Sequence, residues 1–236
     1  MQPDHASRTV LAVCGLAVEA RLAAGPGVRT LAGGARSRAL ANAIERELAA
    51  GAAAIISFGV AGALTSDLAP GALIVASTIV GDAENFPVDA EWASALLRRL
   101  PTAIHAPLAG RDSVVADPES KSRLHIETGA SAVDMESHVA ACIAAEHGLP
   151  FVALRAIADP LARALPQAAL IAMRFDGGVD LRAVMQSVAR RPHQLPQLLR
   201  IALDMRRALS ALARGRRLLG DRLGYADLDE LLLHVI

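Results

Sequence analysis

The chain alternates short apolar runs with segments in which apolar residues recur every three or four positions. The apolar runs predict buried strands at residues 9–14, 52–58, 72–80, 105–108, 131–136 and 151–157. The periodic segments predict helices at residues 18–24, 37–48, 91–100 and 120–125, and one that follows residue 136 and ends at Gly148. The glycine-containing residues 59–62 are expected to form a loop. This alternation predicts a single α/β domain whose central sheet is mixed, largely parallel and twisted, with helices flanking it.

A pair of prolines separates this alternating region from a segment of different character. From Leu195 to Leu212 apolar residues recur at three- and four-residue steps, and arginines occupy mostly the other faces. This pattern predicts a basic amphipathic helix. We therefore expect a globular domain over residues 9–190 and a C-terminal amphipathic extension over residues 191–236.

Charge is distributed unevenly along the chain. The 24 basic and 24 acidic side chains cancel, but residues 190–217 hold eight arginines and one acid, Asp204, so this segment carries +7 and the remainder −7. An apolar content of 53% excludes a disordered chain. The zero net charge disfavours a wholesale nucleic-acid-binding fold. The basic segment suggests an anionic partner such as a membrane surface, an acidic protein or a nucleic acid.

The mean hydropathy of +0.36 raises the question of a membrane span. The longest uncharged stretch is residues 48–66, close to the roughly 20 residues that a bilayer requires, but three glycines interrupt it, which favours a buried strand. Residues 1–8 do not resemble a secretory signal. Two cysteines, Cys14 and Cys142, are too few for a disulfide framework or a four-cysteine metal site. We expect a cytoplasmic protein with reduced thiols.

Acidic residues follow three of the predicted strands. Glu19 comes just after the first strand. Asp134 and Glu136 follow the apolar pair at residues 132–133, and Asp159 ends the run that begins at residue 151. Ligands of α/β sheets bind at the carboxyl ends of the strands, where carboxylates with shifted pKa values can perform acid–base chemistry. Taken singly, each of these acids is equally typical of a helix cap or a turn.

Several blocks of sequence, in this order, resemble the nucleoside phosphorylase and nucleosidase superfamily. The blocks are residues 13–19 (VCGLAVE), 33–36 (GGAR), 58–64 (FGVAGAL), 133–136 (VDME) and 150–159 (PFVALRAIAD). Each block is short, and their ordered succession carries the resemblance. It spans about residues 9–190 and implies a catalytic domain of the nucleoside phosphorylase type.

The resemblance implies roles for individual residues. Asp159 matches the aspartate that protonates the purine N7, Glu136 matches the glutamate that binds the ribose 2′ and 3′ hydroxyls, and Met135 lies against the sugar. The chemistry agrees, because adenine is a poor leaving group until it is protonated and a carboxylate below the ribose stabilises an oxocarbenium-like sugar. The other residues expected to bind substrate are Asp134, Gly59, Val60, Ser113 and Arg155.

The identity of the nucleophile separates two readings. Glu19 stands where nucleosidases of the family place a water-activating glutamate, whereas Ser57 and Val60 replace the phosphate-binding arginine and serine of the phosphorylases. This favours water. Arg36 and Arg111 remain candidate ligands for an anion, since arginine binds phosphate well. A phosphate-dependent phosphorylase that yields ribose 1-phosphate is therefore the runner-up, with phosphate as its co-substrate.

The nucleoside itself is less closely defined. Ser113 replaces the family's aromatic residue beside the base, so base stacking is expected to be weaker or to come from elsewhere. Within the superfamily the chain is similar to the hopanoid-associated phosphorylase branch, whose members are implicated in removing adenine from adenosylhopane. A methylthioadenosine/S-adenosylhomocysteine nucleosidase is an alternative.

A lipid-linked nucleoside would give the basic helix a function. Residues 195–217 have the apolar stripe and arginine faces of a helix that lies on anionic lipid, which would place the protein at the inner face of a membrane. The same stripe fits a helix that packs on the body or on a partner subunit.

Other expectations complete the picture. No metal or redox cofactor is implied by the spacing of candidate ligands, nucleic acid is not expected as a partner, and the family leads us to expect a homo-oligomer. A reading of a different class is a catalytically silent lipid- or protein-binding module, although such a module has no physical reason to retain all three acids, Glu19, Glu136 and Asp159.

Overall fold

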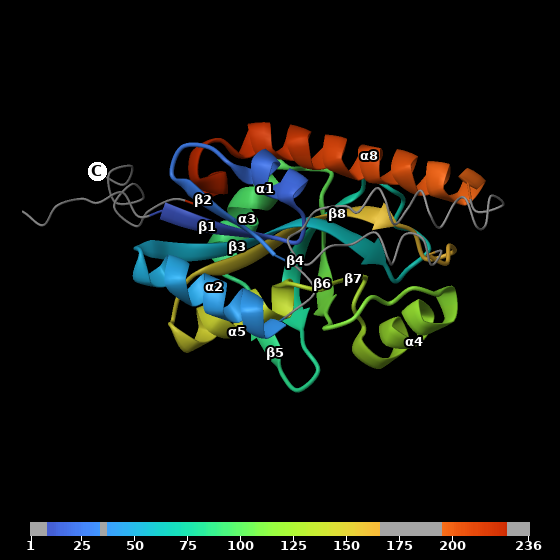
Figure 1. Cartoon of the computed structure of the whole chain (residues 1–236), viewed down its shortest axis with the longest axis horizontal. Coiled ribbons are helices and arrows are strands. Elements are labelled where there is room, and N and C mark those ends of the chain that lie inside the picture. The colour runs from blue at the N-terminus through green and yellow to red at the C-terminus, as the bar shows by residue number, and fades with distance from the viewer. Residues whose placement is uncertain (1–8, 34–36, 166–194, 226–236) are drawn as a thin grey trace, which may run out of the picture.

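The computed structural model describes residues 9–33, 37–165 and 195–225, in which helices cover a central sheet (Figure 1). The strands are β1 (Thr9–Cys14), β2 (Val28–Ala32), β3 (Ala52–Ala63), β4 (Leu73–Val80), β5 (Asn85–Pro87), β6 (Ile104–Gly110), β7 (Ala132–Asp134) and β8 (Phe151–Asp159). The helices are α1 (Ala17–Ala23), α2 (Ser37–Ala49), α3 (Ala90–Arg99), α4 (Pro118–Thr128), α5 (Ser137–Glu146) and α8 (Leu195–Leu219), and a short 3₁₀ helix spans Asp221–Gly224. The predicted α/β class is confirmed.

The sheet is mixed and partly closed. Its order is β2-β1-β3-β7-β6-β4-β5, and β8 pairs with both β3 and β4. Strand β3 runs parallel to β1 and β8, and β6 runs parallel to β4 and β7, whereas the β3–β7, β4–β5 and β4–β8 pairs are antiparallel. Because β3, β7, β6, β4 and β8 pair in succession and β8 returns to β3, these strands form a ring. The largely parallel sheet that the pattern predicts is confirmed, with this closure added.

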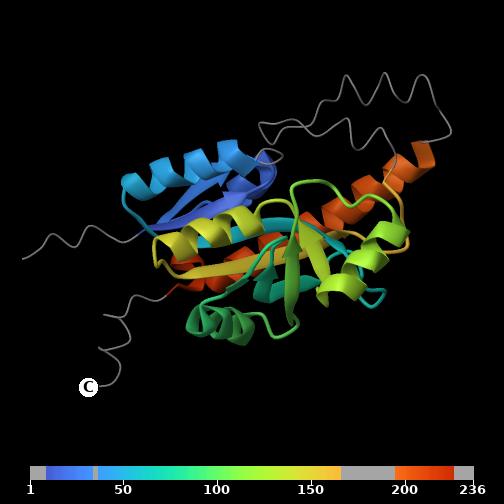
Figure 2. The same ribbon diagram turned by 90° about the horizontal axis from the view of Figure 1, so that it is seen from below.

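Both faces of the sheet are buried. In β1, Leu11 and Val13 face one core while Val10 and Ala12 face the other, and all four are 0% exposed. Helices α2 and α5 cover the first face, and they lie side by side in Figure 2. Helices α1, α3 and α8 cover the second. Neither face of β1 meets water, which explains why its sequence is a continuous apolar run.

Helix α8 confirms the predicted amphipathic helix and extends it to Leu219. Its inward residues Ala208, Ala211 and Leu212 are at most 2% exposed and pack in the core that α1 and α3 share. Arg216 Nε donates a hydrogen bond of 2.8 Å to the carbonyl oxygen of Ala23 at the end of α1. The helix is thus packed on the body along one face. The domain boundary expected at residue 190 lies outside the described residues.

The prediction of a loop at residues 59–62 is wrong. Strand β3 continues to Ala63, because Gly59, Val60 and Ala61 pair with β8 while Gly62 pairs with β7. Residues 59–61 pair with β8 along one edge, and on the other edge Val60 N donates to the Glu19 carboxyl group. The extended backbone is therefore satisfied, which overrides the turn preference of its glycines.

Two strands escaped the pattern. Strand β2 has only half-buried or exposed residues, and β5 is three residues long. The helix expected at residues 120–125 is longer, since Asp117 caps it by accepting a hydrogen bond from Ser120 N and Gly129 ends it in the left-handed conformation. The remaining predicted boundaries agree to within a few residues.

The uncharged stretch at residues 48–66 contains the whole of β3, so it forms a buried strand as expected. Of the helices in the described ranges, none combines the length and the apolar character that crossing a bilayer needs.

Candidate active site

Glu19 lies in the first turn of α1 and is 1% exposed. Its Oε1 accepts a hydrogen bond of 2.8 Å from Val60 N on β3, and its Oε2 accepts one of 2.8 Å from Leu16 N. Burial raises the pKa of Glu19, and the nearby Arg155 guanidinium and these backbone donors oppose that rise. The carboxyl group is therefore fixed in place between the first helix and the long central strand.

Two glycines let the backbone approach the acids. A Cβ at Gly15, just after β1, would stand 2.7 Å from Glu136 Oε1. A Cβ at Gly59 would stand 2.5 Å from Arg155 Nη1 and 2.7 Å from Glu19 Oε2. A larger residue at either position would push these side-chain ends aside, so the two glycines permit the close approach of Glu19, Arg155 and Glu136 to the backbone after β1 and within β3.

Arg155, on β8, is the cation at the centre of this group and is 1% exposed. Its Nε lies 2.6 Å from Asp134 Oδ2, a close ion pair without the alignment of a hydrogen bond. Its Nη2 lies 3.3 Å from Glu136 Oε2 and donates to Ser57 Oγ at 2.5 Å. The guanidinium thus joins β7, β8, β3 and the start of α5.

Asp134 and Ser137 complete the arrangement. Asp134 Oδ1 accepts hydrogen bonds from Ser137 N at 3.0 Å and Glu136 N at 3.3 Å, and the Ser137 hydroxyl contacts Asp134 Oδ2. The same hydroxyl donates to Ser57 Oγ at 2.9 Å. Asp134 therefore orients the first turn of α5, from which Glu136 projects.

Glu136 is 7% exposed, and its surroundings favour the neutral form. Burial raises its pKa to about 8, the Arg155 cation opposes the rise, and the negative charges of Asp134 and Glu19 reinforce it. One guanidinium faces three carboxyl groups here, so the site holds a proton at neutral pH.

Asp159 ends β8, and its side chain is 17% exposed. Lys121 Nζ, from α4, lies 2.6 Å from Asp159 Oδ2, while a Cβ at Gly62 would stand 3.5 Å from the same oxygen. Burial raises the pKa of Asp159 above its usual value, and the hydrogen bond and charge of Lys121 oppose the rise. Gly62 pairs with both Asp159 and Val133, so Asp159 lies across β3 from the start of the Asp134–Glu136 segment.

The structure brings together most of the residues singled out from the sequence. Glu19, Glu136, Asp134, Arg155, Gly59 and Val60 form one connected cluster, with Met135 half-buried beside it.

The other sequence candidates are not part of this connected cluster. Asp159 lies across β3 from it, and Arg111 adjoins it only through its backbone, since Arg111 N donates to the carbonyl oxygen of Asp134 at 2.9 Å. Ser113 is exposed in the segment between β6 and α4. Arg111 Nε lies 3.0 Å from Asp82 Oδ1, and its Nη1 donates to the carbonyl oxygens of Val80 and Gly110. Arg36 lies outside the described residues.

Sequence reasoning missed Ser137 and Lys121. Ser137 directly follows the expected glutamate, so its position was the available signal. Lys121 carried a different signal, since it is the only lysine in the chain. In the described part of the chain, no three His, Cys, Asp or Glu side chains are grouped so that they could hold a metal ion.

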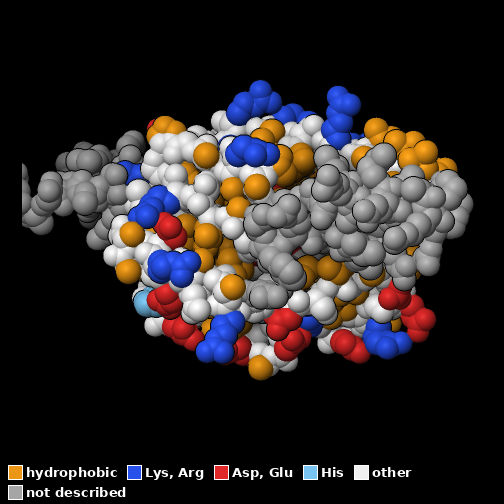
Figure 3. Space-filling model, in the orientation of Figure 1, with side chains coloured by type: hydrophobic (Ala, Val, Ile, Leu, Met, Phe, Trp, Pro, Cys, Tyr) orange, Lys and Arg blue, Asp and Glu red, His pale blue; other side chains and the backbone are white. Residues whose placement is uncertain are grey.

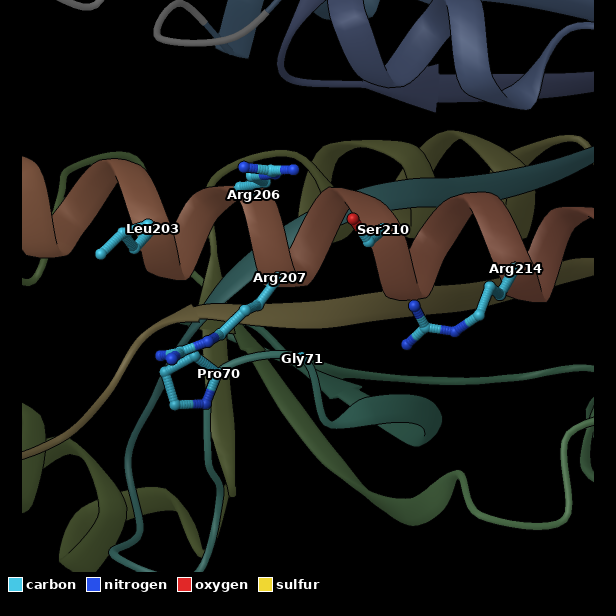
Figure 4. Close-up of a pocket in the computed structure, with 7 residues that line it drawn as sticks. All are labelled: Pro70, Gly71, Leu203, Arg206, Arg207, Ser210 and Arg214. Carbon is cyan, nitrogen blue, oxygen red and sulfur yellow. The ribbon is translucent and has the colours of Figure 1, made fainter.

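A surface groove runs along α8 and includes none of the three acids. Its walls are Pro70, Gly71, Leu203, Arg206, Arg207, Ser210 and Arg214. In Figure 4, Arg207 reaches toward Pro70 while Arg206 lies on the other side of the helix. Arg207 Nη1 also donates to Asp204 Oδ1 at 2.9 Å, so part of this positive charge is neutralised within α8.

The chain was compared with family models, curated sequences and solved structures of known proteins. The sequence model of the family described as the Phosphorylase superfamily matches residues 10–200. No curated protein sequence matches the chain.

Solved structures share the fold. Futalosine hydrolase of Helicobacter pylori is 16% identical, with a TM-score of 0.64 over 90% of this chain and 97% of that one. S-adenosylhomocysteine nucleosidase from Streptococcus pyogenes, in complex with 5-methylthiotubericidin, is 19% identical, with a TM-score of 0.59 over 85% and 98%. The 5′-methylthioadenosine/S-adenosylhomocysteine nucleosidase from Helicobacter pylori, with butyl-thio-DADMe-Immucillin-A, is 17% identical, with a TM-score of 0.58 over 89% and 98%. At these identities the likeness is one of fold.

Proposed function

Because the chain belongs to the Phosphorylase superfamily, we propose that it hydrolyses the N-glycosidic bond of an adenine nucleoside and releases adenine. Membership confirms the expected class of enzyme, an N-ribosyl hydrolase or a nucleoside phosphorylase. The observation that carries the choice of hydrolysis is the placement of Glu19, buried and held by Val60 N and Leu16 N beside the Arg155–Glu136 pair.

The mechanism assigns one task to each acid. Asp159 donates its proton to N7 of the base while the electron pair of the N-glycosidic bond moves onto the base. Glu136 binds the 2′ and 3′ hydroxyls of the ribose, against which Met135 lies. The cluster of Glu19, Asp134 and Glu136 holds one proton and one guanidinium, so its remaining negative charge stabilises the positive charge that develops on the sugar. Water attacks C1′, and Glu19 accepts the proton that the water loses. A pKa raised by burial suits both Asp159, which must carry a proton, and Glu19, which must accept one.

The charges near Glu19 argue against phosphate as the nucleophile. Arg155 is the cation of this cluster, and it is already engaged by Asp134, Glu136 and Ser57. A phosphate placed beside these carboxyl groups would be repelled, since burial strengthens like-charge interactions. A phosphorylase remains the runner-up, and Arg36 and Arg111 are the arginines through which it would operate.

We propose adenosylhopane as the nucleoside, on the basis of the sequence resemblance and of the surface of α8. Leu195, Leu199 and Leu203 are 48%, 58% and 54% exposed. Figure 3 shows apolar side chains gathered where α8 begins and basic ones along its length. This is the arrangement of a helix that rests on anionic lipid, where each arginine near the surface contributes about 1 kcal/mol. The alternative is a methylthioadenosine/S-adenosylhomocysteine nucleosidase, which the names of two structural neighbours favour.

Product analysis tests the function and the substrate together. Adenine release is measured from adenosylhopane and from methylthioadenosine, each with and without phosphate. We expect phosphate-independent release that is faster from adenosylhopane. Strict dependence on phosphate would overturn the hydrolytic assignment, and a preference for methylthioadenosine would overturn the lipid-linked substrate alone.

The proposed membrane contact has a test of its own. Leu199→Gln is expected to weaken binding to vesicles of anionic lipid while hydrolysis of a water-soluble nucleoside is unchanged. Ile126→Gln serves as the control, because Ile126 is 82% exposed but lies on α4 and not on α8. Equal binding by both variants would contradict the contact.

Two further proposals have their own tests. We propose, from the family resemblance, that the protein is a homo-oligomer, which sedimentation equilibrium tests. We also propose, from the expected reduced thiols and the surface of α8, that it works in the cytoplasm at the inner membrane face, which fractionation of cells tests.

A further inference from the structure

Lys121 is unusual in both composition and burial. It is the only lysine among the 24 basic residues of the chain, and its side chain is 0% exposed. Lysine is rarely buried completely unless its charge is paired. The other 23 of these basic residues are arginines, so the use of lysine at this one position requires an explanation.

The surroundings of the ammonium group supply that explanation. Lys121 Nζ lies 2.6 Å from Asp159 Oδ2 and donates hydrogen bonds of 3.1 Å to the carbonyl oxygens of Pro160 and Arg163. Its three N–H groups thus match three acceptors grouped around one point. A planar guanidinium directs its donors differently and is larger. The site is built for lysine.

The two oxygens of Asp159 are treated differently. Oδ2 is engaged by Lys121, whereas Oδ1 is buried and has no hydrogen-bond partner among the described residues. A buried oxygen without a partner is costly, so its retention suggests that a ligand completes it. Lys121 therefore fixes the carboxyl group in the orientation that leaves Oδ1 for the substrate.

The other charged groups near Asp159 balance one another. Arg163 lies in the segment after β8, and its guanidinium pairs with Asp204 of α8. Asp204 is 3% exposed and also pairs with Arg207. The effects of Arg163 and Asp204 on Asp159 oppose each other, which leaves Lys121 as the cation in direct contact with the carboxyl group.

We propose that Lys121 is the positioning residue of the proton donor, holding Asp159 Oδ2 so that Oδ1 faces the base and stabilising the carboxylate as it forms. The inference rests on the proposed function, since it takes Asp159 as the acid. During cleavage the proton leaves Asp159 for N7, the glycosidic electron pair goes to the base, and a negative charge appears on the carboxyl group. The ammonium group keeps its own proton throughout.

The interaction strengthens as the reaction proceeds. Before transfer the ammonium group donates to a neutral carboxyl group, and after transfer it donates to a carboxylate, which is a stronger acceptor. Stabilisation that is larger in the transition state than in the bound substrate raises kcat and leaves KM nearly unchanged. A fall in kcat without a change in KM would therefore distinguish a role in proton donation from a purely structural contact between α4 and β8.

Leaving groups that need no proton provide the test. Lys121→Met removes the charge at similar length, and Arg123→Met is the matched control, because Arg123 is on the same helix with a side chain that is 65% exposed. Each full-length variant is assayed on an adenine nucleoside and on an aryl riboside whose leaving group departs unprotonated. We expect Lys121→Met to lower kcat on the adenine nucleoside by about 10²-fold, with KM and aryl riboside cleavage close to wild type. Arg123→Met should behave as wild type on both.

Two results would overturn the proposal. Equal loss on both substrates would make Lys121 a structural tie only, and no loss on either would leave it without a role. Asp159→Asn tests the proposed function separately, because it should remove adenine release and spare the aryl riboside. Should Asp159→Asn leave adenine release intact, the proposed acid itself is wrong.

A measurement on the wild-type chain keeps the proposal testable if Lys121→Met does not fold. Lysine labelled with ¹³C at Cε gives one signal, because the chain has one lysine. Adenine binding at Asp159 should shift this signal in the wild type and not in Asp159→Asn. A signal unmoved by saturating adenine would contradict the proposal.

Discussion

At the scale of single residues, the site is defined by an excess of buried acid over buried base. Arg155 faces Glu19, Asp134 and Glu136, and all of these side chains are buried. Three carboxylates with one guanidinium would leave two uncompensated negative charges in a medium of low dielectric constant. The raised pKa of Glu136, about 8, is the consequence.

This excess predicts how stability depends on pH. The folded chain holds the Glu136 proton until about pH 8, whereas the unfolded chain loses it near 4.5. The stabilisation is present below the unfolded value and is lost as the pH rises through the folded one, by at most about 1.4 kcal/mol per pH unit. We expect Tm of the ligand-free protein to fall as the pH rises from 4.5 to 8, by about 2–4 °C per unit.

Matched variants identify the group. Glu136→Gln should flatten this decline, because the amide does not titrate, while Glu127→Gln, at an exposed position on α4, should retain it. Melting curves across the pH range provide the measurement. An unchanged slope in Glu136→Gln would place the proton elsewhere.

Gly59 gives a second prediction at this scale. The Cβ of Gly59→Ala would meet Arg155 Nη1 at 2.5 Å and Glu19 Oε2 at 2.7 Å, so both side chains must move. A displacement of about 1 Å in a catalytic group can lower the rate by about 10²-fold, and we expect a loss of that order in steady-state kinetics. The control is Gly33→Ala, where a Cβ would have no neighbour within 4 Å. Equal activity of the two variants would contradict the assignment of Glu19 and Arg155 to the site.

At the scale of elements, helix α8 has two apolar surfaces with different surroundings. Leu212 is 0% exposed in the core beneath the helix, whereas Leu203 is 54% exposed on the groove side. The periodicity of the sequence does not distinguish these two surfaces, which is why packing on the body and contact with lipid were alternatives for one apolar stripe. The described contacts show that packing occupies the inward face alone.

Paired truncations of these leucines measure the division. Leu212→Ala is expected to lower the free energy of unfolding by about 2–5 kcal/mol because it leaves a cavity, whereas Leu203→Ala should change it by less than about 0.5 kcal/mol. Denaturant titration gives both values. Similar losses at the two positions would mean that the outer leucines are also part of the core.

The elements show how far sequence reasoning reaches. Residues 9–14 were predicted without error, because a strand buried on both faces leaves a continuous apolar run. Residues 59–62 were not, since their pairing with β7 and β8 is non-local and no short-range pattern encodes it. Lys121 was missed for the same reason, because its partners lie 38 to 42 positions further along the chain.

At the scale of the whole molecule, the zero net charge is a balance between two regions. The acids that end β7 and begin α1 meet around Arg155 in the body, Asp159 ends the strand β8, and arginines are concentrated on α8. In Figure 3 basic side chains stand along the α8 edge, and most acidic ones lie on the opposite edge. The proposed division of labour follows, with chemistry in the acidic body and contact with anionic surfaces on the basic helix.

The central claim is that water, activated by Glu19, replaces the base. It is tested most directly by running one complete turnover in H₂¹⁸O with phosphate present and weighing the sugar product by mass spectrometry. We predict a free sugar with a single ¹⁸O at C1′ and no sugar phosphate. A ribose 1-phosphate product without the label would contradict the account.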